Sequence, residues 1–482
     1  MQDTSHASAR RTPARALFER WFCVQGVDPR RTIAFGLLYF AIFSALTLLD
    51  GVAISMFVKR VGAEELPQYF GVIAIANLVA VGLYVPFAER FSSVRVFVGL
   101  AAGLSLSCLG AWWCLTDESA STAFYGSLYA AREVFQALFL LHFGTFLQRF
   151  FSRKQLKQVM PLVYAGGRVG GMAGGAVLTH AGASLGLVNL LLVAAVVALW
   201  VAGGAVALSL RFRPADDARD DEASTALDAR AQEFDRRARE SARGFFDALR
   251  RSPLLLWHSI SGVAYIGCRY VLAFQYSTFF EGHFADEVEL AAFLGVYAQV
   301  ALGASLVLQL FLVTRLVRWV GLRGTQFGYA VCVMAALGLS AVHPTLAVAV
   351  FGRFVEQELR LGLRNPTNQL VLNFLSRPLR VRMRCWNAGV VTPVATMATS
   401  LSLGVATAAA LPLAVPALGL AVGFAYFVSN RFMNLSYTEK TTLGQLVESK
   451  ARRDEVRTRS GIRVGPVPAM ARTPTLRLRS AI

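Results

Sequence analysis

The sequence predicts an all-α membrane protein with twelve transmembrane helices arranged as two six-helix bundles. Apolar runs repeatedly reach the roughly 20 residues that a helix needs to cross a bilayer. Only 16% of the 482 residues are charged, and a charged segment, 211–252, separates the runs into two sets of six. This composition excludes a water-soluble enzyme, a disulfide scaffold, and a disordered or fibrous chain.

Each apolar run stops at charged, proline or glycine residues, which locates the helix ends to within several residues. The first set of predicted helices covers residues 33–58, 68–88, 94–115, 123–146, 159–179 and 185–210. The second set covers residues 254–280, 290–313, 325–341, 346–375, 383–411 and 414–432. The predicted parts are therefore a basic tail (1–31), a bundle (32–210), a charged linker (211–252), a bundle (253–433) and a basic tail (434–482).

Lysine and arginine are distributed unequally between the two sides of this arrangement. With the N-terminus in the cytoplasm, 40 of the 48 basic residues fall on the cytoplasmic side, six fall within helices, and only Lys59 and Arg60 fall outside. Cytoplasmic loops of membrane proteins carry such an excess, so both termini are predicted to be cytoplasmic. Helices rather than strands predict a bacterial inner membrane. The net charge of +18 thus indicates topology and contacts with membrane lipids, and not nucleic-acid binding.

Residue types that form metal sites and disulfides are scattered along the sequence. The six cysteines and six histidines form no cluster, and no CxxC motif is present. The sequence therefore predicts no metal site, no cofactor and no disulfide framework. It also lacks a nucleophile–base constellation, so no catalytic residues are assigned and the chain is not predicted to be an enzyme.

Ionised residues inside predicted membrane helices are candidate functional residues, because each is costly unless it is paired or faces water. The segment 346–375 is the richest. Its polar residues recur at spacings of three and four, which places them on one face of an α-helix: Arg353, Glu356, Gln357, Arg360, Arg364 and Asn368. The pairs Glu356–Arg360 and Arg353–Gln357 would offset part of the cost of burial. Glu358 points elsewhere, so its partner is expected on another helix.

Pro366 follows in the same segment, where it is predicted to break or kink the helix. A break would free backbone carbonyls beside Arg364, a feature of many transporter sites.

Other predicted helices also contain charged residues. Arg132 and Gln136 lie in 123–146 on one helix face with Tyr125 and Tyr129, and Glu133 lies on the flank of that face. Asp50 in 33–58 and Arg269 in 254–280 could form an ion pair between the bundles, either a static one or one that breaks during a transport cycle.

Arg168 lies within the glycine-rich stretch YAGGRVGGMAGG. Two glycine ridges run through this stretch at a spacing of four residues: Gly166, Gly170 and Gly174, and Gly167, Gly171 and Gly175. Such ridges let neighbouring helix backbones approach closely, and the stretch matches no phosphate-binding loop.

The balance of buried charge predicts the sign of the ligand. Six arginines against four acids leave an excess of about +2 within the membrane, which an anion would offset. The planar fork of arginine suits phosphate or carboxylate, so the predicted ligand is a small organic anion, preferably phosphorylated. The predicted substrate-binding residues are Arg132, Glu133, Gln136, Arg168, Arg269, Arg353, Glu356, Arg360 and Arg364. The predicted gating or coupling residues are Asp50, Glu133, Glu356 and Pro366.

Two six-helix halves joined by a long cytoplasmic loop resemble the major facilitator superfamily. Two segments, FLQRFFSRKQLKQVMPLVYAGGRVGGMAGG and ELRLGLRNPTNQLVLNFLSRPLRVRMR, further resemble the ATP/ADP translocase family, over most of residues 33–434. That resemblance implies nucleotide exchange, with ATP or ADP as candidate substrates, through charged residues in the first, fourth, seventh and tenth helices. Glu133 and either Arg360 or Arg364 fit the family pattern. Asp50 and Arg269 depart from it, because the family usually has lysine and glutamate at these places.

Two functions follow from these patterns. The first is a secondary transporter that moves an organic anion by alternating access around an arginine-rich cavity at the membrane midplane. The alternative is a multi-pass membrane module without transport, engaged in lipid handling, sensing or assembly, in which the same charges form fixed structural pairs.

Overall fold

The protein is described from a computed structural model. It covers residues 28–116, 121–212, 245, 249–250, 252–309, 313–372, 375, 377–409, 411 and 413–459. The predicted N-terminal tail and charged linker, and the C-terminal tail beyond residue 459, lie almost wholly outside these residues. The chain divides into two compact units, Met1–Met433 and Asn434–Ile482, and the described part of the second unit is helical.

The described residues form helices with short connections and no strand. The first helix set comprises α2 (Pro29–Arg60), the short η1 (Ala63–Glu65), α3 (Leu66–Arg90), α4 (Ser93–Thr116), α5 (Thr122–Gln148), α6 (Arg153–Leu185) and α7 (Leu187–Arg211). The local sequence explains where several of these helices begin. The Asp28 side chain accepts the N–H of Arg30 in front of Pro29, and Ser152 with Gln155 forms a capping box before α6.

The second helix set begins after the linker. It comprises α10 (Pro253–His283), α11 (Glu287–Val307), α12 (Val313–Val342), α13 (Leu346–Phe354), η3 (Val355–Arg364), α14 (Asn365–Leu372), α15 (Arg377–Trp386), η4 (Asn387–Val391), α16 (Thr392–Ala408) and α17 (Ala414–Arg459). The apolar segments predicted from the sequence fall on these helices, with ends shifted by several residues. Both η3 and η4 are π-helical insertions between α-helices.

Within the described residues, seven helical stretches are long and apolar enough to cross a membrane. They are Pro29–Arg60, Ala63–Arg90, Ser93–Thr116, Leu187–Arg211, Glu287–Val307, Trp319–Val342 and Arg382–Ala408. The chain is therefore a multi-pass helical membrane protein. Helices α5, α6 and α10 carry ionised side chains, which lower their mean hydropathy.

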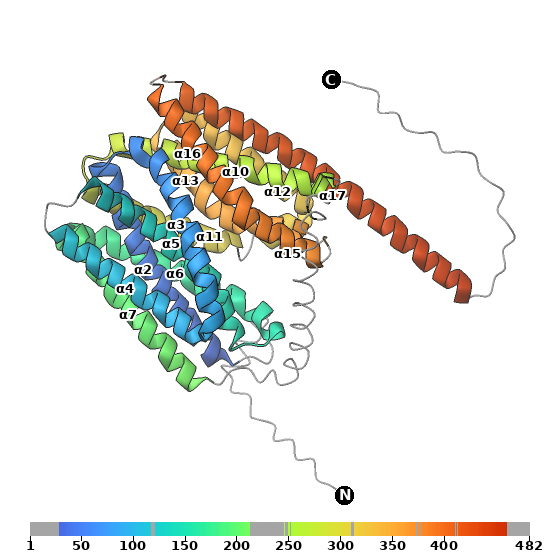
Figure 1. The fold of residues 1–482 in the computed structure, drawn as a ribbon, viewed down its shortest axis with the longest axis horizontal. Coiled ribbons are helices and arrows are strands. Elements are labelled where there is room, and N and C mark those ends of the chain that lie inside the picture. Colours follow the sequence, from blue (N-terminus) through green and yellow to red (C-terminus); the bar gives the residue numbers. More distant parts are fainter. Residues whose placement is uncertain are drawn as a thin grey trace, which may run out of the picture. The chain divides into compact units, whose positions relative to one another are not determined.

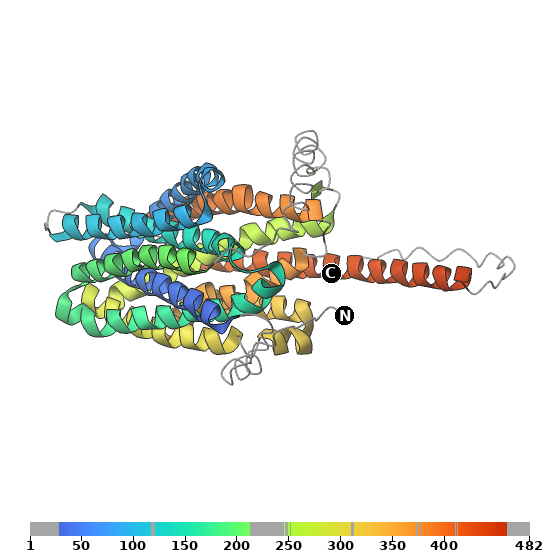
Figure 2. The ribbon, with the colours of Figure 1, turned by 90° about the horizontal axis from the view of Figure 1, so that it is seen from below.

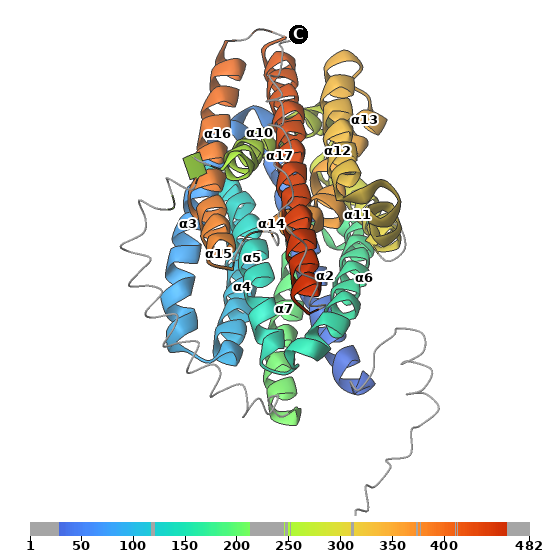
Figure 3. The same cartoon turned by 90° about the vertical axis from the view of Figure 1, so that its right-hand side faces the viewer.

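Helix α2 is the most buried helix of the first set, and it packs against α5, α6 and α7 while α4 covers α7 (Figure 1). Seen from below, most helices run along a common direction (Figure 2). The two sets meet where α6 contacts α11 and where α3 contacts α16 (Figure 3). At the second contact, the Ser400 hydroxyl donates to the carbonyl of Pro67 over 2.5 Å.

The glycine ridges of α6 confirm the predicted close helix packing. A Cβ atom on Gly166 or Gly174 would lie 2.6 Å from a backbone oxygen of α2, and one on Gly170 would overlap the carbonyl of Phe40. The second ridge begins against α2, at Gly167, and ends against α11, where a Cβ on Gly175 would lie 2.7 Å from the carbonyl oxygen of Gly295. Glycine thus sets the separation of α6 from helices of both sets.

The segment predicted as one helix over 346–375 differs from an ordinary α-helix. Its middle, η3, is a ten-residue π-helix, so residues three and four apart no longer share one face as the sequence pattern assumed. Of the predicted break or kink at Pro366, the break is wrong, because the helical backbone continues from η3 into α14. The hydroxyl of Thr367 donates to the carbonyls of Leu363 and Arg364, which are therefore not left free.

The glycine contacts predict a position-dependent cost of adding one methyl group. Gly170→Ala should lower the melting temperature, since overpacking against the α2 backbone costs about 1–3 kcal/mol. Gly182→Ala in the same helix is the control, because its Cβ would meet only side-chain carbons at 3.5 Å or more. Thermal unfolding of the two variants in detergent measures the difference, and equal melting temperatures would contradict the packing argument.

Candidate functional site

A polar cavity lies between the two helix sets and is lined by residues of α2, α5, α6, α10, α11, α13 and η3. Its free volume is about 110 Å³, enough for a few water molecules, because paired side chains occupy most of the space. Most of the predicted substrate-binding residues line it: Arg132, Glu133, Gln136, Arg168, Arg269, Arg353 and Arg360. Asp50, Gln357 and Glu358 also line it.

Asp50 of α2 is held between two arginines. Nη1 of Arg132 on α5 bonds to Oδ1 of Asp50, and Nη2 of Arg353 on α13 lies 3.5 Å from Oδ2. The two arginine side chains expose only 7% and 4% of their surface, whereas that of Asp50 exposes 30%. The carboxylate therefore faces the cavity and links α2 to a helix of each set.

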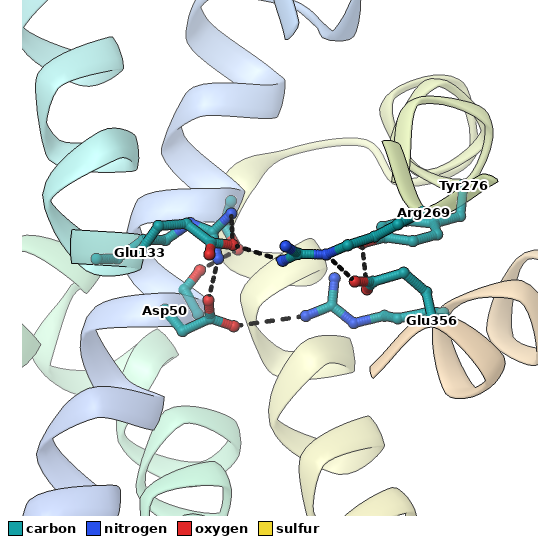
Figure 4. A network of polar contacts seen from close by, with 9 residues as sticks. Asp50, Glu133, Arg269, Tyr276 and Glu356 are labelled. Carbon is teal, nitrogen blue, oxygen red and sulfur yellow. Dashed lines mark hydrogen bonds and ion pairs between the residues drawn. The ribbon is translucent and has the colours of Figure 1, made fainter. Parts of the chain in front are cut away.

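Arg269 of α10 forms the second link between the sets. Its Nε donates to Glu356 Oε1 over 2.7 Å, and its Nη2 lies 3.5 Å from Glu133 Oε1. Figure 4 shows Arg269 between these carboxylates, with the Tyr276 hydroxyl 3.5 Å from the other oxygen of Glu356. The expected ion pair between Asp50 and Arg269 is not formed, because each residue is bonded to other partners.

Glu358 and Arg168 form the third link. Nη1 of Arg168 on α6 lies 2.5 Å from Glu358 Oε2, and both side chains are largely buried. This confirms that Glu358 pairs with another helix. The expected intrahelical pairs within the segment are not formed. Glu356 in the π-helix bonds to Arg269, and Arg353, which lies in α13 before the π-helix, pairs with Asp50.

One arginine of the cavity has no carboxylate partner among the described residues. Four carboxylates are matched by four arginines, and Arg360 lines the same cavity without an ion pair in the described part of the chain. Buried guanidinium N–H groups of Arg132 (Nε), Arg353 (Nε and Nη1) and Arg360 (Nε) meet no acceptor among the described residues. Unmatched buried donors are costly, so these N–H groups are open positions for further hydrogen-bond acceptors.

Aromatic rings hold two of these arginines in place. The guanidinium carbon of Arg132 lies 4.1 Å from the ring centre of Tyr129. That of Arg353 lies 5.4 Å from the ring centre of Tyr276 and 5.1 Å from that of Tyr297. Such cation–π contacts stabilise desolvated arginines. Tyr297 was not predicted, since α11 contains no charged residue within the membrane that would draw attention to it.

Arg364, a predicted ligand of the same anion, lies apart from the central cavity. Its guanidinium carbon lies 3.3 Å from the ring centre of Tyr265, in a small pocket that Tyr329 and Tyr426 also line. Its distance from the other arginines follows from the π-helical turn, which directs it into the second helix set. Among the described residues, no group of three His, Cys, Asp or Glu side chains could hold a metal ion.

A second polar cluster joins the helix sets where α2 and α10 end, and we refer to Lys59, Arg60, Tyr125, Glu281 and Glu287 as the Lys59–Arg60 cluster. Lys59 Nζ donates to the carbonyls of Glu281 and of Phe284, each over 2.7 Å, and thereby satisfies acceptors at the end of α10. Arg60 donates to both carboxylate oxygens of Glu287 over 2.6 Å and to the Tyr125 hydroxyl.

The cluster was not predicted, although the sequence contains a signal for it. Lys59 and Arg60 are the only basic residues that the predicted topology places outside, and Glu281 and Glu287 lie on that same side. These two basic residues depart from the cytoplasmic excess of lysine and arginine. A contact between them and the acids of the second helix set on the same side could therefore have been predicted.

Comparison with known proteins shows the fold. The chain is similar to the nucleoside transporter NupG (TM-score 0.58, 12% identity, covering 84% of this chain and 99% of that one). It is also similar to a D-xylose-proton symporter (TM-score 0.56, 11% identity, 82% and 96% covered) and to a proton-dependent oligopeptide transporter (TM-score 0.54, 14% identity, 85% and 98% covered). No model of a protein family matches the sequence, and no curated protein sequence matches it. The chain therefore has the fold of these membrane transporters.

The Arg168–Glu358 pair predicts a characteristic pattern of stabilities. Glu358→Met leaves a buried arginine without its partner and should cost about 3–5 kcal/mol, whereas the double variant Arg168→Met with Glu358→Met should recover most of this loss. Unfolding in mixed micelles measures both. A double variant as unstable as the sum of the single variants would contradict a direct pairing.

The Lys59–Arg60 cluster predicts compensation between reversed charges. Arg60→Glu or Glu287→Arg should each lower the melting temperature by a few degrees, because like charges then face one another. The double reversal should recover at least half of the loss. The recovery should shrink in high salt, since Arg60 is 39% exposed and its charge is screened. Absence of any recovery at low salt would show that the two residues do not interact.

Proposed function

We propose that this protein is a secondary transporter that moves a small organic anion across the membrane by alternating access. Three supports converge. The fold is similar to those of transporters for nucleosides, sugars and peptides. The central cavity lies between the two helix sets and contains more arginines than the carboxylates can match. Ion pairs, which can exchange partners, join the sets across this cavity.

The proposed topology has twelve membrane crossings, with bundles 32–210 and 253–433 and both termini in the cytoplasm. Its support is the 40-to-2 distribution of basic residues together with helices over each predicted apolar segment. An inner membrane of a bacterium is the proposed location. In this topology the Lys59–Arg60 cluster lies on the outer side of the membrane, where it joins the two helix sets.

The position of Arg360 is the main support for an anionic substrate. It lines the cavity without an ion pair, so an incoming anion can bind it without first displacing a carboxylate of the protein. Phosphate or carboxylate groups match the donor geometry of arginine, and Arg132 and Arg353 offer further donors nearby. A phosphorylated solute is therefore the preferred class. ATP and ADP are candidates through the sequence resemblance alone.

The cavity must enlarge before a solute of this class can enter, since its free volume is only about 110 Å³. Enlargement requires the pairs that connect opposite helix sets to separate: Arg269–Glu133, Arg353–Asp50 and Arg168–Glu358. An anion that binds the released arginines would compensate for the loss of these ion pairs. Asp50, Glu133 and Glu356 are thus proposed as gating residues, and Pro366 is proposed to act through the flexibility of the helix that carries η3.

Arg360→Ala provides the test of this function. It should abolish uptake of the substrate and the thermal stabilisation by it. It should not lower the melting temperature of the ligand-free protein, because no ion pair is lost and a buried N–H group without an acceptor is removed. Arg384→Ala removes an exposed arginine of α15 and serves as the matched control. The screen would use purified protein with nucleotides, sugar phosphates, inorganic phosphate and di- and tricarboxylates.

A ligand at a hundred times its dissociation constant stabilises a protein by about 2.7 kcal/mol, a readily measured shift. Stabilisation that persists in Arg360→Ala would refute the site. No stabilisation or flux with any anion, together with one co-purifying protein partner, would favour the alternative of a non-transporting membrane module with fixed ion pairs.

A further inference from the structure

A groove separate from the central cavity lies between α3 and α4, with α5 at its floor, and has a free volume of about 590 Å³. Its walls are largely apolar and include Leu83, Phe87, Phe91, Val96, Leu100 and Leu138. Leu83 and Phe87 expose 59% and 56% of their surface. Since α3 and α4 are both long and apolar enough to cross a membrane, hydrocarbon is the medium that meets these side chains.

One end of the groove is basic. Arg95 lines it, and Arg90 lies on the other side of the short turn that joins α3 to α4. This turn connects two candidate spans, so it lies at a membrane–water interface whichever side it faces. Both arginines are exposed, and neither forms an ion pair in the described part of the chain. Glu89 is exposed beside them and reduces the local charge to about +1 without cancelling it.

Hydrogen bonds hold the groove in shape beneath its basic end. His142 of α5 donates from Nε2 to the carbonyl of Ser93 at the start of α4, over 2.7 Å. Its Nδ1 then accepts the hydroxyl of Tyr84 on α3, over 2.8 Å. These two hydrogen bonds connect α5 to both α3 and α4. Further along α4, Gly99 leaves open space, because a Cβ atom there would meet nothing within 4 Å.

We propose that this groove binds an anionic phospholipid, with one acyl chain between α3 and α4 and the headgroup phosphate on Arg95. The apolar walls match the chain, and the interfacial arginine without a carboxylate partner matches the phosphate. The net positive charge at this end selects an anionic headgroup over a zwitterionic one. This site is independent of the proposed transport function, because none of its residues lines the central cavity.

Native mass spectrometry of the full chain in detergent tests the proposal, with dioleoyl phosphatidylglycerol and dioleoyl phosphatidylcholine as probes of equal chain length. The first molecule of phosphatidylglycerol should bind more tightly than phosphatidylcholine. Arg95→Ala should weaken the first phosphatidylglycerol about fivefold, to the level of phosphatidylcholine. Gly99→Leu should weaken the first site for both lipids, because the new side chain fills the groove.

Arg384→Ala, which removes an exposed arginine elsewhere, should bind lipid as the unmodified protein does, and melting temperatures would verify that all variants are folded. Three results would each overturn the proposal. The first is lipid binding that is unchanged in both groove variants. The second is an equal loss in Arg384→Ala. The third is a dimer of the chain that Gly99→Leu abolishes, since the groove would then be covered by a second copy.

Discussion

Burial of ionised side chains is the constraint on which the rest of this structure depends. A carboxylate at membrane depth is costly unless a cation and further donors compensate it. Each of the four acids at membrane depth has an arginine on a different helix, and three of these contacts cross between the helix sets. Apolar surface decides that the helices lie in a membrane, but it does not distinguish one apolar neighbour from another. The ion pairs and the glycine contacts of α6 determine which helices are neighbours.

Much of this arrangement could be predicted from the sequence because hydropathy and charge are local properties. The apolar segments, the buried charges and the need of Glu358 for a partner on another helix can all be found by counting along the chain. The close approach at the glycine ridges also follows from spacing alone. The partners of Asp50 could not be found in this way, since several arginines at similar depth compete for each acid. The choice among them depends on helix rotation.

Helix rotation was predicted wrongly in one segment. The predicted polar face from Arg353 to Arg364 requires 3.6 residues per turn throughout, and the π-helix η3 departs from this geometry. As a result Glu356 bonds to Arg269 instead of Arg360, and Arg364 lies among tyrosines of the second helix set. Tyr297 and the Lys59–Arg60 cluster escaped prediction for a related reason: their importance lies in contacts between segments far apart in the chain.

The π-helix also limits how this protein can change over evolution. A widened turn is what a single inserted residue produces in an α-helix, and its first carbonyl, that of Val355, is supported by the hydroxyl of Tyr329 over 3.3 Å. Loss of one residue between Val355 and Arg364 would restore regular geometry. It would also rotate one end of the helix against the other by about 100°, separating the acids from their arginines. The length of this segment is therefore fixed more strictly than its composition, and homologues should tolerate substitutions here far better than gaps.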